Sequence, residues 1–147
     1  MRSCRIITGD KGSGKSTRLL EISKTVPNPA GFISIRTENG YSLLDLSTGK
    51  SSLLMTDEPR FPDRFRRWYF DQRLFDTANS RLESISSGTV FIDEIGRLEL
   101  DGGGFAPSLR ALHSHDIDLI IAVRDAFLQD VIERFLSDTC VSVEEPL

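Results

Sequence analysis

The sequence predicts an α/β fold, with a mainly parallel β-sheet flanked by helices and an antiparallel β-hairpin insert. Three observations lead to this prediction. Short continuous apolar segments, residues 89–92 and 119–123, are typical of strands buried on both faces of a parallel sheet. Segments with apolar residues at helical spacing alternate with these strands, as right-handed β-α-β units require. Apolar and polar residues alternate on either side of Asn39-Gly40, which predicts a hairpin with a type I′ turn.

The remaining elements follow from the same patterns along the chain. A strand beyond the turn at residues 47–50 would extend the hairpin into a three-stranded antiparallel meander. Prolines and polar side chains at residues 57–64 predict an exposed loop. The expected strands span residues 4–8, 32–38, 41–46, 52–55, 67–70, 89–92, 119–123 and 139–143, and the expected helices span residues 16–26, 70–85, 106–114 and 127–135.

Length and composition predict a single domain, residues 1–147, with the hairpin insert at about residues 31–56. Hydrophobic residues make up 39% of the chain and charged residues 27%, as is typical of globular proteins. No apolar run approaches the roughly 18 residues that cross a membrane, and the N-terminus has no long apolar stretch of a secretory signal. We therefore expect a cytoplasmic protein with no membrane partner. The net charge of −4 argues against general affinity for nucleic acids.

The cysteine and histidine residues do not predict a metal site. Cys4 and Cys140 lie in the first and last expected strands, and we expect both to be buried free thiols. His113 and His115 are two residues apart, so they do not share a face of the helix expected there.

A glycine-rich stretch connects the first expected strand to the first expected helix. It matches G-x-x-x-x-G-K-[ST], the phosphate-binding loop of P-loop NTPases. Glycines let the backbone curl so that successive N–H groups point at one set of phosphate oxygens, and the following helix presents its positive end to the same anion. Lys15 would reach the β- and γ-phosphates, and the Ser16 hydroxyl would be placed to bind Mg²⁺. The predicted nucleotide-binding residues of this loop are Gly9, Asp10, Lys11, Gly12, Ser13, Gly14, Lys15, Ser16 and Thr17.

An acidic pair, Asp93-Glu94, directly follows the strand expected at residues 89–92. Ligands of parallel sheets lie beyond the carboxyl ends of the strands, so the pair and the phosphate loop are predicted to share one edge. Asp93 would then hold Mg²⁺ together with Ser16, and Glu94 would orient a water and accept its proton. An acidic pair alone is equally typical of a solvated loop, but the upstream phosphate loop favours a hydrolytic site. Lys15, Asp93 and Glu94 are therefore the predicted catalytic residues.

These motifs and the residues around them resemble the THEP1-type nucleoside-triphosphatases. The resemblance covers nearly the whole chain in order: the phosphate loop, residues 31–32, residues 67–70 (RWYF) and residues 92–100 (IDEIGRLEL), whose Asp-Glu-Ile-Gly-x-x-Glu-Leu pattern is the most specific part. It implies a RecA-like P-loop fold with a catalytic glutamate, and slow hydrolysis of several nucleoside triphosphates to the diphosphate and phosphate. It also implies a second nucleotide-binding segment made of Val90, Phe91, Ile92, Asp93, Glu94, Ile95, Gly96 and Arg97.

Two arginines near the predicted site each have two interpretations. Arg97 follows the acidic pair and would either approach the γ-phosphate or pack on the neighbouring helix. Arg124 follows the strand at residues 119–123 and would either sense the γ-phosphate or pair with Asp125 or Asp130. An arginine from either position could stabilise charge in the transition state.

An arginine–aromatic segment, residues 60–73, has three interpretations. The favoured one is a solvated helix start with aromatic residues in the core. The second is a flap that closes on the nucleotide, with Trp68 or Tyr69 near the base. The third is a surface for a nucleic-acid or protein partner. The segment contains Arg60, Phe61, Arg64, Phe65, Arg66, Arg67, Trp68, Tyr69, Phe70 and Arg73.

Together these residues predict a Mg²⁺-dependent nucleoside-triphosphatase. It would accept several bases, because a phosphate loop binds the triphosphate and is nearly blind to the base. Two other functions stay open. A nucleoside or nucleotide kinase would use the arginine–aromatic segment as a lid, and a nucleotide-dependent switch would use slow hydrolysis only to time partner binding.

Overall fold

The computed structural model describes residues 1–146, and the expected domain end at Leu147 lies outside the described residues. Nine strands form one sheet in the order β5-β6-β4-β3-β2-β7-β8-β1-β9. The strands are β1 (Ser3–Gly9), β2 (Ala30–Arg36), β3 (Gly40–Asp45), β4 (Ser51–Thr56), β5 (Asp63–Phe65), β6 (Trp68–Phe70), β7 (Ser87–Ile95), β8 (Asp116–Arg124) and β9 (Val141–Glu144). The helices are α1 (Lys15–Ser23), α2 (Gln72–Glu83), α3 (Arg97–Leu100), α4 (Ala106–Leu112) and α5 (Leu128–Phe135), with a short 3-10 helix, η1 (Asp125–Phe127), before α5.

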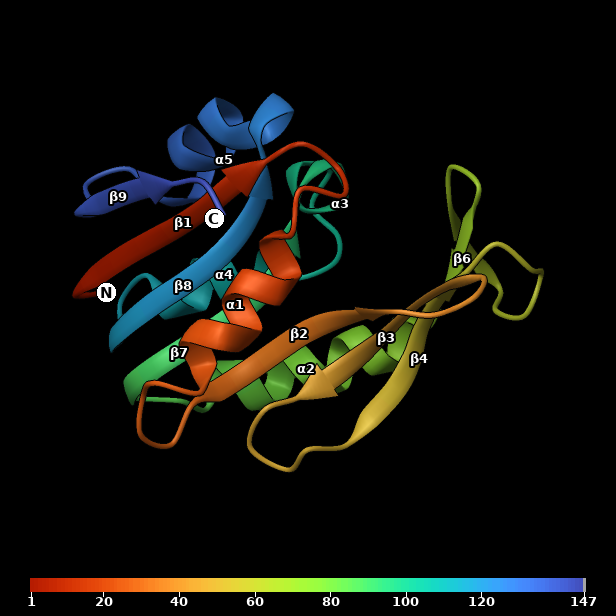
Figure 1. Ribbon diagram of the computed structural model, residues 1–147, viewed down its shortest axis with the longest axis horizontal. Helices are drawn as coiled ribbons and strands as arrows, with labels where there is room; N and C mark the ends of the chain where they lie inside the picture. Colours follow the sequence, from red (N-terminus) through yellow and green to blue (C-terminus); the bar gives the residue numbers. More distant parts are fainter. Residues whose placement is uncertain (147) are drawn as a thin grey trace.

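The sheet has two halves that meet at β2 (Figure 1). In the parallel half, β2, β7, β8, β1 and β9 run in the same direction. In the antiparallel half, β3, β4, β6 and β5 continue the sheet from the other edge of β2. Figure 1 shows β6 and its loops at the far end of this second half. The predicted α/β fold, with mostly parallel core strands and an antiparallel insert, is confirmed.

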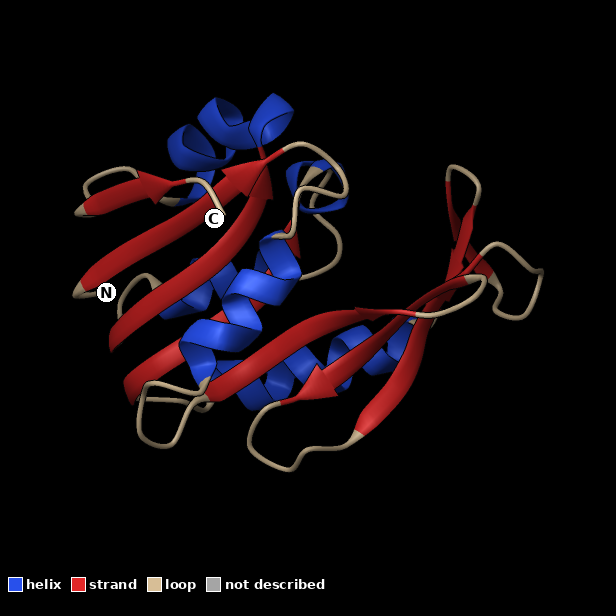
Figure 2. Cartoon of the chain, viewed as in Figure 1, coloured by secondary structure: helices blue, strands red, loops and turns tan. Residues whose placement is uncertain are grey.

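Helices cover both faces of the parallel half (Figure 2). On one face, Leu19 and Ile22 of α1 join a buried cluster with strand residues that include Phe91 and Ile120. On the other face, α2, α4 and α5 contribute to a larger cluster that includes Leu82, Leu109, Leu112 and Phe135. Because both faces are covered, the central strands β7 and β8 need the continuous apolar segments seen in the sequence.

The predicted hairpin and its three-stranded meander are present, but the predicted type I′ turn at Asn39-Gly40 is wrong. A type I′ turn requires a positive φ at both central residues, and neither Asn39 nor Gly40 has one. Gly40 instead begins β3, where a Cβ atom would lie 1.9 Å from the backbone oxygen of Met55 in β4. The close approach of two strands, and not the turn, therefore requires a glycine there.

Several element boundaries also differ from the predictions. Helix α1 ends at Ser23 and not at Val26. Phe70 is the last residue of β6 and not the first of a helix. Helix α2 begins only after Asp71, whose side chain caps it by accepting hydrogen bonds from the Arg73 and Leu74 N–H groups. Strand β7 continues to Ile95, so the acidic pair lies inside the strand and not beyond it.

The arginine–aromatic segment is mostly a β-hairpin, so its favoured interpretation as a helix start is wrong. Residues Asp63–Phe65 and Trp68–Phe70 pair as β5 and β6, and β6 pairs with β4. Part of the loop expected at residues 57–64 is therefore in β5. The hairpin is held in the sheet because the backbone of β6 pairs with that of β4. The spacing of apolar residues along the segment does not reveal this long-range pairing.

The cysteines differ from each other in burial. Cys4 is buried as expected, and burial raises the pKa of its thiol to about 12. Cys140 is exposed, contrary to the expectation, because it precedes the edge strand β9 and does not lie within the sheet. Both thiols are free. Within residues 1–146, no helix has the length and apolar character needed to cross a membrane.

Candidate active site

The phosphate loop joins the end of β1 to the start of α1. Gly12 and Gly14 have φ values of 77° and 95°, a left-handed conformation that glycine adopts without steric cost. The Arg18 N–H donates to the Gly14 carbonyl oxygen at 3.0 Å, so helical hydrogen bonding starts directly at the loop. The free N–H groups of the first turn of α1 are therefore directed at the loop.

Lys15 connects the phosphate loop to the acidic pair. It is the first residue of α1, and only 6% of it is exposed. Its Nζ donates to the carbonyl oxygens of Asp10 at 2.8 Å and Gly9 at 3.2 Å, which holds the ammonium group over the loop. The same Nζ lies 3.9 Å from Glu94 Oε1. A cation of the loop and an acid of β7 thus meet at one edge of the sheet.

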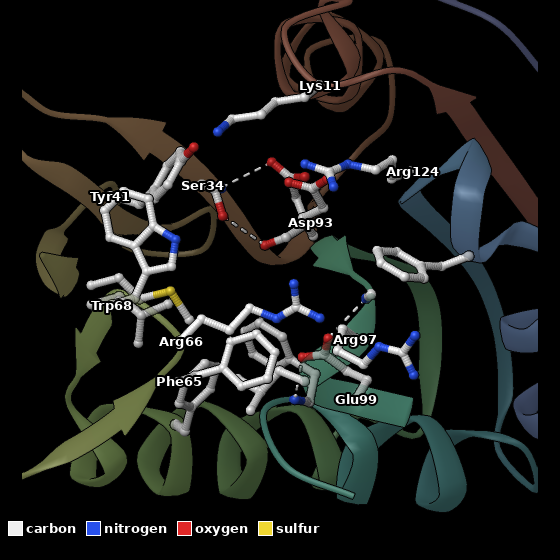
Figure 3. A pocket seen from close by; sticks show the side chains of 18 of the residues that line it. Lys11, Ser34, Tyr41, Phe65, Arg66, Trp68, Asp93, Arg97, Glu99 and Arg124 are labelled. Atoms are coloured by element: carbon white, nitrogen blue, oxygen red, sulfur yellow. Dashed lines mark hydrogen bonds between the residues drawn. The ribbon is translucent and has the colours of Figure 1, made fainter. Parts of the chain in front are cut away.

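Asp93 is fully buried near the end of β7. Its Oδ2 accepts a hydrogen bond from the Ser34 N–H at 3.0 Å, and the Ser34 hydroxyl donates to the Asp93 carbonyl oxygen at 3.0 Å (Figure 3). Its Oδ1 is buried and has no hydrogen-bond partner. The pKa of Asp93 is raised to about 7. Burial is the largest cause and the Glu94 charge adds to it, while the Ser16 hydroxyl, the Ser34 N–H and Lys15 oppose the rise. The Ser16 hydroxyl is thus close to this carboxylate without completing a hydrogen bond to Oδ1.

Two cavities meet beside Glu94. The first, the phosphate cavity, has a volume of about 370 Å³ and is lined mainly by the phosphate loop and the start of α1. The second, the arginine cavity, has a volume of about 510 Å³ and lies between the acidic pair, α3 and the antiparallel half (Figure 3). Four residues line both cavities: Lys11, Ser34, Tyr41 and Glu94. The Glu94 side chain, 42% exposed, therefore stands at the boundary between them.

The turn of the β5–β6 hairpin forms one wall of the arginine cavity. Phe65 pairs with Trp68, so the two residues of the turn are Arg66 and Arg67. Figure 3 shows the Arg66 side chain directed into the cavity. The Arg67 guanidinium lies 4.5 Å from the centre of the Trp68 ring, and Trp68 contacts Tyr41 edge-on, with ring centroids 5.6 Å apart.

Arg97 and Arg124 line the same cavity from the parallel half. Both guanidinium groups lie over the ring of Phe127, at 5.3 and 5.9 Å from its centre. Among residues 1–146, neither arginine is within 4.0 Å of a carboxylate oxygen, so the ion pair of Arg124 with Asp125 or Asp130 is not formed there. Figure 3 shows Arg124 extending toward Asp93, whereas Arg97 turns away from it.

Glu99 fixes the chain that follows the acidic pair. Its Oε1 accepts a hydrogen bond from the Gly96 N–H at 2.9 Å, and its Oε2 accepts one from the Phe105 N–H at 3.0 Å. Burial raises the pKa of Glu99 to about 7, against the lowering effect of these two N–H donors. The side chain thereby ties α3 to the start of α4.

The family of the chain follows from its similarity to known proteins. Residues 4–145 match the family model described as NTPase. The chain belongs to this family. Among its relatives is the nucleoside-triphosphatase THEP1 of Methanothermobacter thermautotrophicus, 30% identical over 153 residues that cover 96% of this chain and 86% of the relative. The nucleoside-triphosphatase THEP1 of Thermotoga petrophila is 27% identical over 140 residues, 88% of this chain and 78% of the relative. The predicted THEP1-type family and the predicted enzyme class, a nucleoside-triphosphatase, are confirmed.

A solved structure shares the fold of this NTPase. The crystal structure of THEP1 from the hyperthermophile Aquifex aeolicus matches with a TM-score of 0.73, over 97% of this chain and 88% of that one. The sequence identity is 18%, so this likeness concerns the fold alone. It supports the predicted P-loop NTPase architecture.

The predicted nucleotide-binding residues fall into four groups. Lys11, Gly12, Gly14, Lys15, Ser16 and Thr17 line the phosphate cavity, and Asp93, Glu94, Gly96 and Arg97 line the arginine cavity. Gly9, Asp10 and Ser13 contribute backbone groups that shape the loop. Val90, Phe91, Ile92 and Ile95 are buried in the core clusters, so their side chains reach neither cavity.

Three polar residues of the site had no predicted role. Ser34 is the one polar residue in the otherwise apolar residues 30–35 of β2. This break in the apolar stretch is a sequence signal that indicates a role for Ser34 at the site. Tyr41 lines both cavities, and Glu99 appeared only as one letter of the family pattern. Their roles depend on strand pairing and on loop closure, which the local sequence does not show.

Proposed function

We propose that the chain hydrolyses nucleoside 5′-triphosphates to the diphosphate and phosphate, with Mg²⁺ as cofactor and Glu94 as the base that activates water. The observation that carries the proposal is the 3.9 Å separation between Lys15 Nζ and Glu94 Oε1. It brings a group that neutralises phosphate and a group that accepts a proton within reach of one γ-phosphate. Membership of the NTPase family supports the same class of reaction.

The phosphate loop binds the triphosphate in this proposal. The N–H groups of Gly12, Ser13, Gly14 and Lys15 surround the β-phosphate. Lys15 exchanges its hydrogen bonds to the loop carbonyls for bonds to the β- and γ-phosphate oxygens, a short movement because its side chain already lies over the loop. Since these contacts are made to phosphate and not to the base, the proposal includes hydrolysis of several nucleoside triphosphates.

The residues at this edge of the sheet fit Mg²⁺. Asp93 Oδ1 is a buried carboxylate oxygen without a hydrogen-bond partner, and the Ser16 hydroxyl is close enough to lower the pKa of Asp93. Nucleotide sites bind Mg²⁺ through one or two protein oxygens together with phosphate oxygens. Such a site needs no cluster of three His, Cys, Asp or Glu side chains, and residues 1–146 contain none. We assign Ser16 and Asp93 as the protein ligands; when bound, the cation neutralises charge on the β- and γ-phosphates.

Glu94 accepts a proton from the attacking water. The water oxygen forms a bond to the γ-phosphorus, the bond from that phosphorus to the bridging oxygen breaks, and the products are the diphosphate, phosphate and one proton. Glu94 suits this role because its carboxylate is partly exposed at the boundary between the two cavities, whereas Asp93 is enclosed. Arg124, which extends toward Asp93 (Figure 3), is available to stabilise the charge that develops in the transition state on the γ-phosphate and the leaving diphosphate.

The substitution Glu94→Gln tests this assignment because it removes the base and keeps the size of the side chain. We expect phosphate release to fall about hundredfold or more, while nucleotide binding, measured by isothermal titration calorimetry, stays close to that of the wild type. Glu21→Gln on the exposed face of α1 is the matched control and should keep the wild-type rate. A Glu94→Gln variant that binds nucleotide and releases phosphate at the wild-type rate contradicts the role of Glu94.

A nucleotide panel tests the remaining parts of the proposal. Phosphate release is measured with ATP, GTP, CTP and UTP, each with Mg²⁺ and with EDTA. We expect all four to be hydrolysed, and the activity to require Mg²⁺. Activity that survives EDTA contradicts the metal requirement, and activity with one base alone contradicts the base tolerance.

A further inference from the structure

The arginine cavity contains positive charge of which the proposed hydrolysis uses only Arg124. Five cationic side chains line it, those of Lys11, Arg66, Arg67, Arg97 and Arg124, together with three acidic ones, those of Asp93, Glu94 and Glu99. Among residues 1–146, none of the five cations lies within 4.0 Å of a carboxylate oxygen. Two of the acids already accept backbone hydrogen bonds, Glu99 from two N–H groups and Asp93 from one. The cavity therefore has a surplus of cations that are free to bind an anion.

The same cavity has an aromatic wall. Trp68, Tyr41 and Phe65 line it, and the Arg67 guanidinium already lies 4.5 Å from the centre of the Trp68 ring. Aromatic side chains and arginine planes stack readily on nucleobases, because every base has a π-face. The volume of about 510 Å³ lies within the range of about 300–1,000 Å³ that is usual for small-molecule sites.

The backbone of the β5–β6 turn presents its arginines to this cavity. Arg66 has a φ of 56°, an uncommon conformation for a residue with a side chain. Arg64 Nε donates a hydrogen bond to the Arg66 carbonyl oxygen at 2.8 Å, which holds this turn. As a result, two consecutive residues, Arg66 and Arg67, both line the cavity.

We propose that the arginine cavity binds a second small molecule that combines an aromatic ring with a phosphate monoester, the chemistry of a nucleoside 5′-monophosphate. A phosphate monoester carries about two negative charges at pH 7, and its oxygens match the planar fork of an arginine. Arg66 and Arg67 bind the phosphate, and the wall formed by Trp68 and Tyr41 stacks on the ring. This ligand is distinct from the nucleotide in the phosphate cavity, and the two sites adjoin at Glu94.

Trp68 gives a direct measurement of this binding, because it is the sole tryptophan of the chain. The probes are the 5′-monophosphates of adenosine, guanosine, cytidine and uridine, with inorganic phosphate and adenosine as the two halves of the ligand. They are titrated into the wild type and into Lys15→Met, whose phosphate loop has lost its cation. We expect at least one monophosphate to change the Trp68 emission saturably in both proteins, and each half to bind about tenfold more weakly or worse.

The substitution Arg66→Asn tests the role of the turn. It removes the charge and keeps the backbone conformation, because asparagine tolerates a positive φ. We expect the affinity for the monophosphate to fall about tenfold. Arg60→Asn is the matched control, since Arg60 is exposed in the same segment and lines neither cavity; it should bind like the wild type. Thermal unfolding of both variants checks that they are folded.

Four results would overturn the proposal. The first is the absence of a saturable Trp68 response to every monophosphate, and the second is inorganic phosphate binding as tightly as the monophosphates. The third is wild-type affinity in Arg66→Asn. The fourth is a response that disappears in Lys15→Met, because it assigns the monophosphate to the phosphate cavity. None of these measurements involves turnover, so each outcome is distinguishable from a failure of the hydrolysis proposal.

Discussion

The two halves of the sheet contribute to the candidate active site in different ways. In the parallel half, most site residues lie in two short segments, the phosphate loop after β1 and the acidic pair of β7, and single residues such as Ser34 of β2 and Arg124 of β8 complete them. In the antiparallel half, the cavity residues come from β3, β4 and the β5–β6 turn. The difference follows from topology: parallel strands all end at one edge, whereas an antiparallel strand reaches the site only through its pairing with neighbours.

The two halves should therefore tolerate different substitutions. The phosphate loop depends on local backbone conformation and on one lysine, so a change there should leave the antiparallel half intact. The arginine cavity depends on strand register and on close backbone contacts, so a change far from any ligand should open it. Substitutions that affect the phosphate loop without opening the arginine cavity, or the reverse, test whether the two halves are independent.

The largest effect is expected from Lys15→Met, which removes the cation of the phosphate loop. Electrostatic groups of this kind contribute about a thousandfold in rate, or about 4 kcal/mol. We expect phosphate release to fall by this order, while the Trp68 emission of the variant stays that of the wild type. Lys24→Met, at the exposed end of α1, is the control and should keep the rate. A shift of the Trp68 emission in Lys15→Met would show that the two halves are not independent.

Much of the parallel half could be predicted from the sequence because its signals are local. Burial on both faces gives β7 and β8 their continuous apolar segments, and a glycine-rich turn between a strand and a helix gives the phosphate loop its pattern. Lys15 and Glu94 are predicted to lie at the same edge of the sheet, because the carboxyl ends of parallel strands meet there. These inferences needed no knowledge of distant contacts.

The antiparallel half could be predicted only in outline. Alternating residues predict the meander, but they also predict a turn at Gly40, whereas Gly40 allows the close approach of β3 to β4. The favoured interpretation of the arginine–aromatic segment, a helix start, is wrong, because the pairing of β6 with β4 links residues that no local pattern connects. The local sequence does not reveal the roles of Ser34 and Glu99 either, since each acts through a hydrogen bond to a different element.

The next effect concerns Glu99, which belongs to α3 but lines the arginine cavity. Burial raises its pKa from the ordinary value of 4.5 to about 7. Between pH 4.5 and about 7, the folded state keeps a proton on Glu99 that the unfolded chain releases. The stabilisation that this proton gives the folded state is complete below pH 4.5 and is lost as the pH rises to about 7. Glu99→Gln cannot titrate. The free energy of unfolding of the wild type, relative to this variant, should fall by up to about 3 kcal/mol across the window.

Urea unfolding at several pH values measures this difference. Comparing the wild type with Glu99→Gln isolates Glu99, because Asp93 titrates in the same range in both proteins. Glu83→Gln, exposed at the end of α2, is the control and should give a curve parallel to that of the wild type. A parallel curve for Glu99→Gln would show that the two N–H donors keep Glu99 ionised throughout.

A smaller effect is expected from Gly40→Ala, which acts on strand register in the antiparallel half. The new Cβ would lie 1.9 Å from the Met55 carbonyl oxygen and 2.8 Å from Thr56 Cα, both of them backbone atoms of β4. We expect the free energy of unfolding to fall by about 2 kcal/mol. The Trp68 emission should shift to longer wavelength as the cavity wall loosens, while nucleotide binding to the phosphate loop is retained.

The control for Gly40→Ala is Gly49→Ala, in the turn between β3 and β4. No atom lies within 4 Å of a Cβ at this position, but its φ of 76° makes alanine strained. The strain costs about 1 kcal/mol, without displacing β4, so the Trp68 emission should not shift. Loss of nucleotide binding in Gly40→Ala would contradict the independence of the two halves.

The smallest effect is expected at β9, the outer edge of the parallel half. Arg5 Nε and Nη2 donate to Glu144 Oε2 at 2.9 Å and Oε1 at 2.7 Å, which joins β1 to β9. The two side chains are 36% and 35% exposed, so solvent screens the pair and its worth is about 0.5 kcal/mol. The Arg5 guanidinium lowers the pKa of Glu144, so this stabilisation is present at neutral pH and is lost on acidification.

Glu144→Gln should therefore lower the free energy of unfolding by about 0.5 kcal/mol at pH 7, and Glu145→Gln, exposed beside it, should change nothing measurable. Phosphate release and the Trp68 emission should both stay unchanged, because no residue of β9 lines either cavity. A loss above about 2 kcal/mol would be of the size seen when a buried network breaks. It would mean that this ion pair, and not the backbone pairing of Cys4–Ile7 with Val141–Glu144, holds the edge strand in place.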